Sequence, residues 1–302
     1  MFRSIILASV AAAIVAAPPV RAGAQTGSGD FSVNERVAQG SWVRIHTYKG
    51  RINVVEGTGE TVEVRGSTRE DDRDRDVQFE MVRGRDGITV CAYVREYQSC
   101  DADGIESDRR NWGRGDRWPS AHFEVRLPKG VKLAARSGNG DITVTGAGAD
   151  VEASSGNGRV RVTTTAGAVR ATTGNGEVTV EGATDEVEAS SGNGRIRVGT
   201  TTGPVRARSG NGDIEVEMAA IRGDGDMDFS TGNGTVSVTV PANFNGELDA
   251  STGHGRIRAD FPITLQGRIN PQRIRATIGT GGRRVRMHTG NGDVELIKRE
   301  LR

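Results

Sequence analysis

The sequence is poor in aromatic residues and carries almost no net charge. Only 4% of its 302 residues are Phe, Trp or Tyr. Because large aromatic side chains usually dominate a broad core, their scarcity favours a narrow core of Val, Ile and Ala. Lys and Arg (40) nearly balance Asp and Glu (39), which gives a net charge of +1. This balance argues against nucleic acid as a main partner.

Long apolar runs are also missing, except near the start of the chain. Arg3, an apolar run over 4–17 and small residues at 22–24 together predict a secretory signal peptide over residues 1–24. The run is short for a membrane span, and no second run follows. The sequence therefore predicts an exported protein without a membrane span, located in the periplasm, outside the cell or at the cell surface. No cysteine lies near the predicted cleavage point, which argues against a lipid anchor.

Glycine, in contrast, is abundant, with 43 residues, and much of it lies in a repeat. Within the repeat, the sequence Gly-Asn-Gly recurs every 18 residues, and two short stretches of alternating apolar residues follow each occurrence. Ile142 and Val144 represent the first stretch, and Val151 and Ala153 the second. Alternation with period two predicts short strands, and units of this size must stack to bury their apolar faces. We therefore predict an all-β fold: a single-stranded parallel β-helix (β-solenoid) with 18-residue coils, capped by a less regular N-terminal β region.

The Gly-Asn-Gly sequences predict tight corners, because Gly and Asn tolerate positive φ. Stacked coils would bring the asparagines into one column, with each side-chain amide bonded to the next. This structural ladder is the favoured interpretation, and a row of sugar- or ion-binding amides is the alternative. The predicted ladder consists of Asn139, Asn157, Asn175, Asn193, Asn211, Asn233 and Asn291.

The outward positions alternate between acidic and basic coils. One such series is Asp141, Arg159, Glu177, Arg195 and Asp213. In a stack of 18-residue coils, each acid would meet an arginine above and below. An exposed pair contributes only about 0–1 kcal/mol. A slip by one coil, however, would oppose like charges, so the pattern favours one coil order. The alternative is a solvated charged face without a role.

The N-terminal part of the chain is less regular. Residues 25–40 are rich in Gly, Ser and Ala and are predicted to be flexible, residues 41–130 to form an irregular β region, and residues 131–302 to form the regular solenoid. Cys91 and Cys100 are the only cysteines, and in an exported chain they predict a disulfide. No histidine stands at a spacing that would favour a metal pair or a catalytic cysteine.

A long polar loop follows Cys100 and combines guanidinium and indole groups. Such residues can form a contact surface for a ligand, and they can equally cover the open end of a solenoid. Both interpretations remain open. The candidate ligand contacts are Arg109, Arg110, Trp112, Arg114, Arg117 and Trp118.

The spacing loosens after Asn211, and the inserted residues are acidic. Asp224, Asp226 and Asp228 alternate and suit a hard cation such as calcium, or they form a solvated bulge. The repeat itself is not a calcium roll, because Ile142 stands where those repeats have a ligand Asp. The corner at Asn291 is predicted to close the series, with the charged tail shielding the last strand edge.

The motifs resemble those of a known family. The stretch 123–131 (FEVRLPKGV), followed by SGNGDITV at 137–144, resembles the bacterial putative-adhesin domain, which is related to head-GIN-type domains. TGHGRI at 252–257 and TGNGDVEL at 289–296 resemble it too, so the similarity covers roughly residues 40–298. The resemblance implies a β-helical fold and supplies no catalytic residues. Fold analogy alone carries little functional information.

No catalytic constellation is apparent in the sequence. Stacking against arginine lowers the pKa of a carboxyl group and makes it a poor general acid. None of the 4 histidines forms an obvious motif with a nucleophile. We therefore predict a non-catalytic exported scaffold or adhesin-like protein of the bacterial envelope or surface, with a glycan or a surface protein as partner and no cofactor other than calcium. The alternative is a periplasmic module that binds or senses a glycan or cell-wall fragment. A β-helix enzyme that acts on polysaccharides is a third, less favoured hypothesis.

Overall fold

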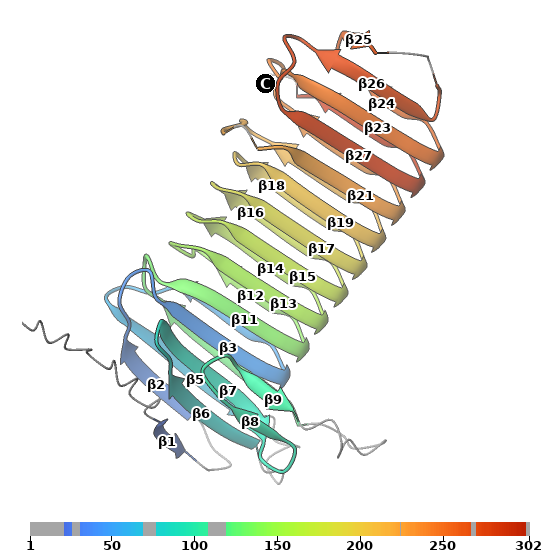
Figure 1. The fold of residues 1–302 in the computed structure, drawn as a ribbon. Helices are drawn as coiled ribbons and strands as arrows, with labels where there is room; N and C mark the ends of the chain where they lie inside the picture. The colour runs from blue at the N-terminus through green and yellow to red at the C-terminus, as the bar shows by residue number, and fades with distance from the viewer. Residues whose placement is uncertain are drawn as a thin grey trace, which may run out of the picture.

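The computed structural model describes residues 21–25, 31–68, 77–107, 119–223, 225–266 and 270–299. These residues form an elongated stack of β-strands in two long sheets, with one small hairpin on the side (Figure 1). The first sheet has 14 strands and the second has 12. In the described part of the chain, no helix is long and apolar enough to cross a membrane. The predicted all-β solenoid is confirmed.

The middle of the chain follows the 18-residue repeat. Each repeat adds one strand to each sheet, and neighbouring strands there are parallel. Residues 18 apart are in register, as in Val151 opposite Val169, except in the last of these repeats, where Asn211 lies opposite Asn233, 22 residues later. The first sheet receives β11 (Lys132–Asn139), β13 (Val151–Asn157), β15 (Val169–Asn175), β17 (Val187–Asn193), β19 (Val205–Asn211) and β21 (Met227–Asn233). The second sheet receives β12 (Ile142–Thr145), β14 (Val160–Thr165), β16 (Val178–Ala183), β18 (Ile196–Thr201), β20 (Ile214–Met218) and β22 (Val236–Val240).

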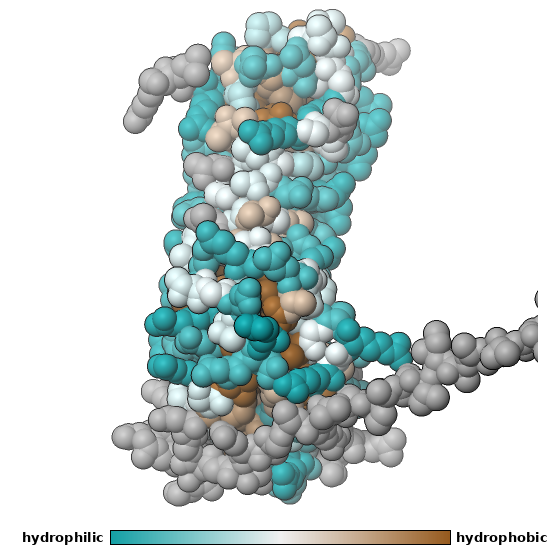
Figure 2. All heavy atoms as spheres, turned by 90° about the vertical axis from the view of Figure 1, so that its left-hand side faces the viewer, coloured by the Kyte–Doolittle hydropathy of each residue, from teal (hydrophilic) through white to brown (hydrophobic). Residues whose placement is uncertain are grey.

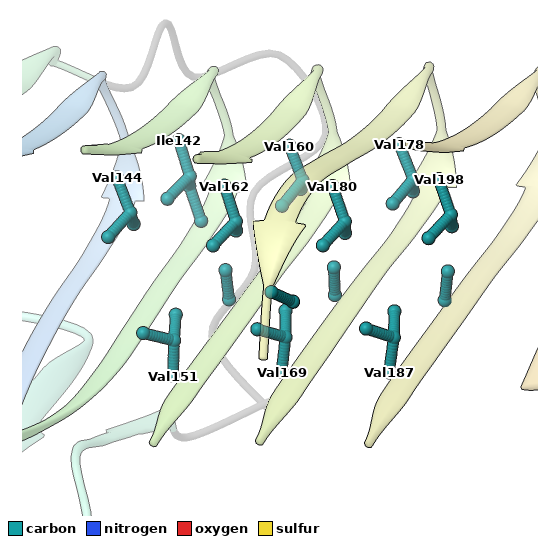
Figure 3. Packing of buried hydrophobic residues seen from close by; sticks show 14 of the residues in the cluster. Ile142, Val144, Val151, Val160, Val162, Val169, Val178, Val180, Val187 and Val198 are labelled. Carbon is teal, nitrogen blue, oxygen red and sulfur yellow. The ribbon is translucent and has the colours of Figure 1, made fainter. Parts of the chain in front are cut away.

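Two kinds of turn join the sheets. The Gly-Asn-Gly turns, here called Asn corners, lead from the first sheet to the second. Longer turns, here called loop corners, lead from the second sheet back to the first. Between the sheets, the inward side chains form columns of like residues (Figure 3). Val160 and Val178 are fully buried, and Val169 is 2% exposed, so the core is narrow and aliphatic as predicted.

The C-terminal end departs from sequence order. The strands there are β23 (Gly246–His254), β24 (Ile257–Ala259), β25 (Ile263–Leu265), β26 (Arg273–Ile278), β27 (Arg284–Asn291) and β28 (Val294–Lys298). In space, β27 lies between β21 and β23, and β28 lies between β22 and β24. The prediction that the last coil closes the stack is therefore wrong. The strand β26 pairs antiparallel with β23 and reverses the direction of the chain. The strands β27 and β28 then fill the position between the β21–β22 coil and the β23–β24 coil.

The N-terminal end shows the same arrangement. The coil formed by β3 (Trp42–Lys49) and β4 (Ile52–Glu56) lies between the β11–β12 coil and the strands β7 (Gly87–Val94) and β10 (Ala121–Leu127). Beyond them, β5 (Thr61–Thr68) and β6 (Val77–Arg83) pair antiparallel with β10 and β7. The predicted regions 41–130 and 131–302 thus share both sheets and one continuous core.

Part of the predicted flexible segment is ordered. Within 25–40, the strand β2 (Phe31–Arg36) pairs antiparallel with β5. Phe31 is 3% exposed, and its ring stacks on Phe79 with 5.3 Å between the centroids. The prediction is therefore wrong for these residues. Phe31 and Val33 alternate with polar residues and pack against the core, although the composition of the segment favours flexibility. Of the predicted signal peptide, residues 1–20 lie outside the described residues, and β1 (Arg21–Gln25) pairs antiparallel with β6.

Candidate functional site

The asparagines form a continuous ladder along the Asn corners. The side-chain Nδ2 of every asparagine of the ladder after Asn139 donates to the Oδ1 of the asparagine in the preceding coil of the stack, at N–O distances of 2.7–2.8 Å. The bonds join Asn139, Asn157, Asn175, Asn193, Asn211, Asn233 and Asn291. His254 follows Asn291 in the register of the sheet. The inner amides use their oxygens within the ladder, which favours the structural interpretation over a row of binding groups.

The outward charges meet across neighbouring coils. Asp141 lies 2.9 Å from the guanidinium of Arg159, and Glu188 lies 2.6 Å from that of Arg170. Burial disfavours the charged form of Asp141, but hydrogen bonds from the Arg159 backbone amide and guanidinium outweigh it and hold the pKa of Asp141 below its usual value. The Asp141 carboxylate is therefore kept ionised, and both carboxylates are bonded to an arginine of a neighbouring coil.

The charge alternation continues through the coil formed by β27 and β28, here called the intercalated coil. In spatial order, Arg286 of β27 lies between Asp228 of β21 and Asp249 of β23. The sequence order would have placed Asp228 directly beside Asp249. The alternation of acidic and basic coils therefore also indicates that β27 lies between β21 and β23. The sequence analysis did not use the alternation in this way.

The predicted acidic cluster is engaged by protein donors. The backbone amide of Arg284 donates to Asp226 at 3.0 Å, and the Asp228 carboxylate lies 3.6 Å from the Arg208 guanidinium. Asp224 lies outside the described residues. Among the residues that the structure describes, no group of three or more His, Cys, Asp or Glu side chains could hold a metal ion.

The disulfide between Cys91 and Cys100 is confirmed. It ties the hairpin of β8 (Gln98–Cys100) and β9 (Ile105–Ser107) to β7. Val82, Tyr93 and Ile105 join the two cysteines in a small second apolar cluster. The disulfide thus attaches the hairpin to β7 within this small cluster, which is separate from the main core.

The hairpin lies beside a buried histidine that the sequence analysis did not single out. His46 of β3 is 6% exposed, and its Nε2 has no hydrogen-bond partner among the described residues. Burial, reinforced by the positive charges of Arg136 and Arg44, lowers the pKa of His46 to about 4, while Asp101 acts in the opposite direction. His46 also lines a shallow cavity of about 210 Å³ with Gln98, Ser107, Arg136 and Ser154. The only signal in the sequence was a histidine at an outward strand position.

The predicted ligand-contact loop follows the β8–β9 hairpin in the sequence. Arg109, Arg110, Trp112, Arg114, Arg117 and Trp118 all lie outside the described residues. The chain leaves the described part at Ser107 and returns at Pro119, just before β10. A contact or capping role for this loop stays a prediction.

An open groove with a volume of about 1260 Å³ lies at the C-terminal end. It lies between two loop corners, one that includes residues 219–223 and one at 241–245. Figure 2 shows the side of the molecule that bears the loop corners, where apolar residues are visible between polar ones. The residues that line the groove are Glu217, Ala219, Ala220, Ile221, Pro241, Ala242, Asn243, Phe244, Asn245, Arg283 and Arg299. The sequence analysis did not find this groove, because it depends on the intercalated coil.

The solved structures with distant similarity to this chain include three bacterial proteins. A putative adhesin from Bacteroides fragilis is 11% identical, with a TM-score of 0.41, covering 92% of this chain and 100% of that chain. A putative adhesin from Parabacteroides distasonis is 12% identical, with a TM-score of 0.37, covering 89% and 97%. A putative cell adhesion protein from Clostridium sporogenes is 9% identical, with a TM-score of 0.30, covering 90% and 100%. Similarity at this level carries no functional argument.

No curated protein matches the chain. A family model described as Toastrack DUF4097 matches residues 109–297, which is more than half of the sequence. This range includes all the regular coils and the intercalated coil. The expected resemblance to a β-helical family of unknown function is therefore confirmed, and this chain belongs to the Toastrack DUF4097 family.

Proposed function

We propose that this protein is a non-catalytic, exported scaffold of the bacterial envelope or surface with an adhesin-like role. The observation that supports this most is the continuous stack, in which bonds between outward side chains join successive coils. An amide ladder runs along the Asn corners, and acid–arginine pairs join successive coils. A structure of this kind holds its shape over its whole length and can carry a binding surface away from an anchoring point.

The state of the described carboxylates supports a non-catalytic role. A general acid needs a carboxyl group whose pKa is raised toward the working pH. Hydrogen bonds from Lys132 instead lower the pKa of Asp150, and those from Arg44 lower the pKa of Asp86. With Asp141, these are the carboxyl groups of the described residues with a resolved shift, and each is shifted away from general-acid catalysis.

The location of the protein tests the proposal most directly. Intact cells would be treated with protease, and the fractions would be probed for the chain. We expect the protein outside the cytoplasm and, for an adhesin-like role, cleaved on intact cells. A deletion strain should then attach less well to surfaces. Protein that is protected from protease in the periplasm would contradict adhesion and favour the alternative, an internal binding or sensing module.

The aromatic residues of the 108–118 loop separate the two roles further. Trp112→Ala combined with Trp118→Ala would remove two residues suited to stacking on a sugar. A scaffold would keep its role in this double variant, whereas a module that senses glycans through the loop would lose its ligand. The attachment assay and a glycan-binding assay on the same variant distinguish these outcomes.

A further inference from the structure

In the described part of the chain, the intercalated coil has no loop corner of its own. In the regular coils, successive loop corners are joined by backbone bonds, such as Thr184 N to Thr165 O at 3.3 Å and Ala219 N to Thr201 O at 3.1 Å. Between β22 and β23, in contrast, the chain passes over one coil position of the stack, because β27 lies between β21 and β23. Among the described residues, no backbone hydrogen bond joins 219–222 to the turn at 241–245. The groove occupies the place of the missing corner.

Two arginines stand at the ends of this missing corner. Arg283 precedes β27, and its guanidinium donates to the carbonyl oxygens of Gly223 and Gly225. Arg299 follows β28, and its Nη1 lies 3.4 Å from both the Met218 carbonyl oxygen and the Glu217 carboxylate. A guanidinium has five N–H donors, so these bonds orient both groups and leave donors for a ligand.

The remaining lining suits a sugar better than a peptide strand. Ala219, Ala220 and Ala242 are small and exposed, so they leave the groove wide. The side chains of Asn243 and Asn245 add amide groups to the wall. A peptide that adds a strand needs an open sheet edge. Here β22 and β28 are both paired on either side, so the groove offers no such edge.

We propose that this groove binds a carboxylate-bearing segment of an acidic glycan. The guanidiniums of Arg283 and Arg299 would pair with uronate carboxylates, which match the planar arrangement of their donors. The amides would bond to hydroxyl groups, and the alanines and Pro241 would contact the apolar faces of the sugar rings. Glu217 carries the only carboxylate among the described residues that line the groove, and it is already close to Arg299. This inference rests on the proposed adhesin-like role and names its ligand class.

A groove-filling variant tests the inference without removing a structural bond. Ala220→Trp places a large side chain in the groove from an exposed position. Ala166→Trp places the same side chain at an exposed position of a regular loop corner, and serves as the matched control. Thermal unfolding of both variants would show that they remain folded. Binding would be measured by calorimetry with a short oligogalacturonate, and with a neutral galactan oligosaccharide of equal length.

We expect the unmodified chain and Ala166→Trp to bind oligogalacturonate, and Ala220→Trp to bind it about tenfold more weakly or not at all. The neutral oligosaccharide should not bind, and affinity should fall as salt increases. Arg283→Gln should weaken binding in the same way. The inference is wrong if the unmodified chain does not bind the acidic probe, if it binds both probes equally, or if Ala220→Trp binds as the control does.

The same variants separate this inference from the proposed function. If the protein lies at the surface and supports attachment but Ala220→Trp attaches normally, only the groove assignment fails. If the protein is protected inside the cell envelope, the adhesin-like role fails, whereas the calorimetric result still decides whether the groove binds uronates.

Discussion

At the scale of single residues, the Asn corners depend on how closely successive coils approach. A Cβ added to Gly174 would lie 2.5 Å from the carbonyl oxygen of Gly156. At Gly176, φ is +152° and an added Cβ would lie 2.2 Å from the carbonyl oxygen of Gly158. The first Gly of the corner is therefore required by contact, and the second by contact and backbone conformation together.

Gly176→Ala should destabilise the protein by about 2 kcal/mol or more, because both the clash and the backbone strain must be relieved. Gly199→Ala is the matched control. Gly199 lies within β18, and an added Cβ would meet only Glu181, at 3.7 Å. The control should be neutral or slightly stabilising. Denaturant unfolding of both variants gives the comparison, and equal effects would show that the corner does not require glycine.

The direction of the ladder hydrogen bonds gives a second prediction. Asn175 donates to Asn157 and accepts from Asn193, whereas Asn139 only accepts within the ladder. Asn175→Asp should cost about 1 kcal/mol at neutral pH, because two oxygens then face each other without a proton. Asn139→Asp keeps its acceptor and should cost little. Melting temperatures test this, and a larger loss at Asn139 would contradict the bond direction.

At the scale of elements, the β8–β9 hairpin covers the buried side chain of His46. The hairpin is attached through Cys91 and Cys100, and Gly104 in its turn lies directly against the His46 ring, where an added Cβ would be 2.1 Å away. The other outward positions of the first sheet in this register are mainly Ser, Thr and Arg, such as Ser154 and Thr172. A neutral, buried imidazole therefore depends on the hairpin above it.

The free energy of unfolding should decrease as the pH falls from 6.5 to 4, because folding lowers the pKa of His46. Its pKa drops from 6.5 to about 4 on folding, so in this range the unfolded chain takes up a proton that the folded chain does not. The difference amounts to roughly 2 kcal/mol between pH 7 and 5. His46→Gln should remove most of this slope in denaturant unfolding. The assignment to His46 fails if the variant keeps the same pH dependence.

At the scale of the whole molecule, each end contains one coil that lies between coils distant from it in sequence. The β3–β4 coil is enclosed at one end and the β27–β28 coil at the other. Stacking energy in a repeat protein arises mainly between spatial neighbours. Each enclosed coil therefore joins segments that a simple solenoid would leave as free ends.

Pairs of cysteines can test the order of the coils. Ser230 of β21 is in register with His288 of β27, which is in register with Ser251 of β23. A chain carrying Ser230→Cys and His288→Cys should form a disulfide on oxidation, because adjacent strands lie about 4.8 Å apart. The pair Ser230→Cys and Ser251→Cys should not, because two strand spacings exceed the reach of a disulfide. Peptide mapping by mass spectrometry distinguishes the pairs. A disulfide in the second pair would show that β23 lies directly beside β21, which contradicts the structure.

The sequence by itself determined the regular part of this protein. The 18-residue spacing of Asn139 to Asn211, with alternating Val, Ile and Ala, specifies the coils, because each strand pairs with an equivalent strand one repeat away. The same spacing specifies the Asn ladder and the acid–arginine contacts. The cysteine pair was found from composition and spacing alone, since the chain contains only two.

Only the tertiary structure decided the order of the end coils and the cavities that follow from it. A strand such as β27 carries the same local pattern wherever it is placed, so periodicity does not say which two coils it joins. That choice depends on antiparallel β26, which turns the chain back, and on the contacts of Arg286 with strands far away in sequence. The groove at Arg283 and Arg299 and the buried site of His46 arise from such long-range contacts, and no local pattern encodes them.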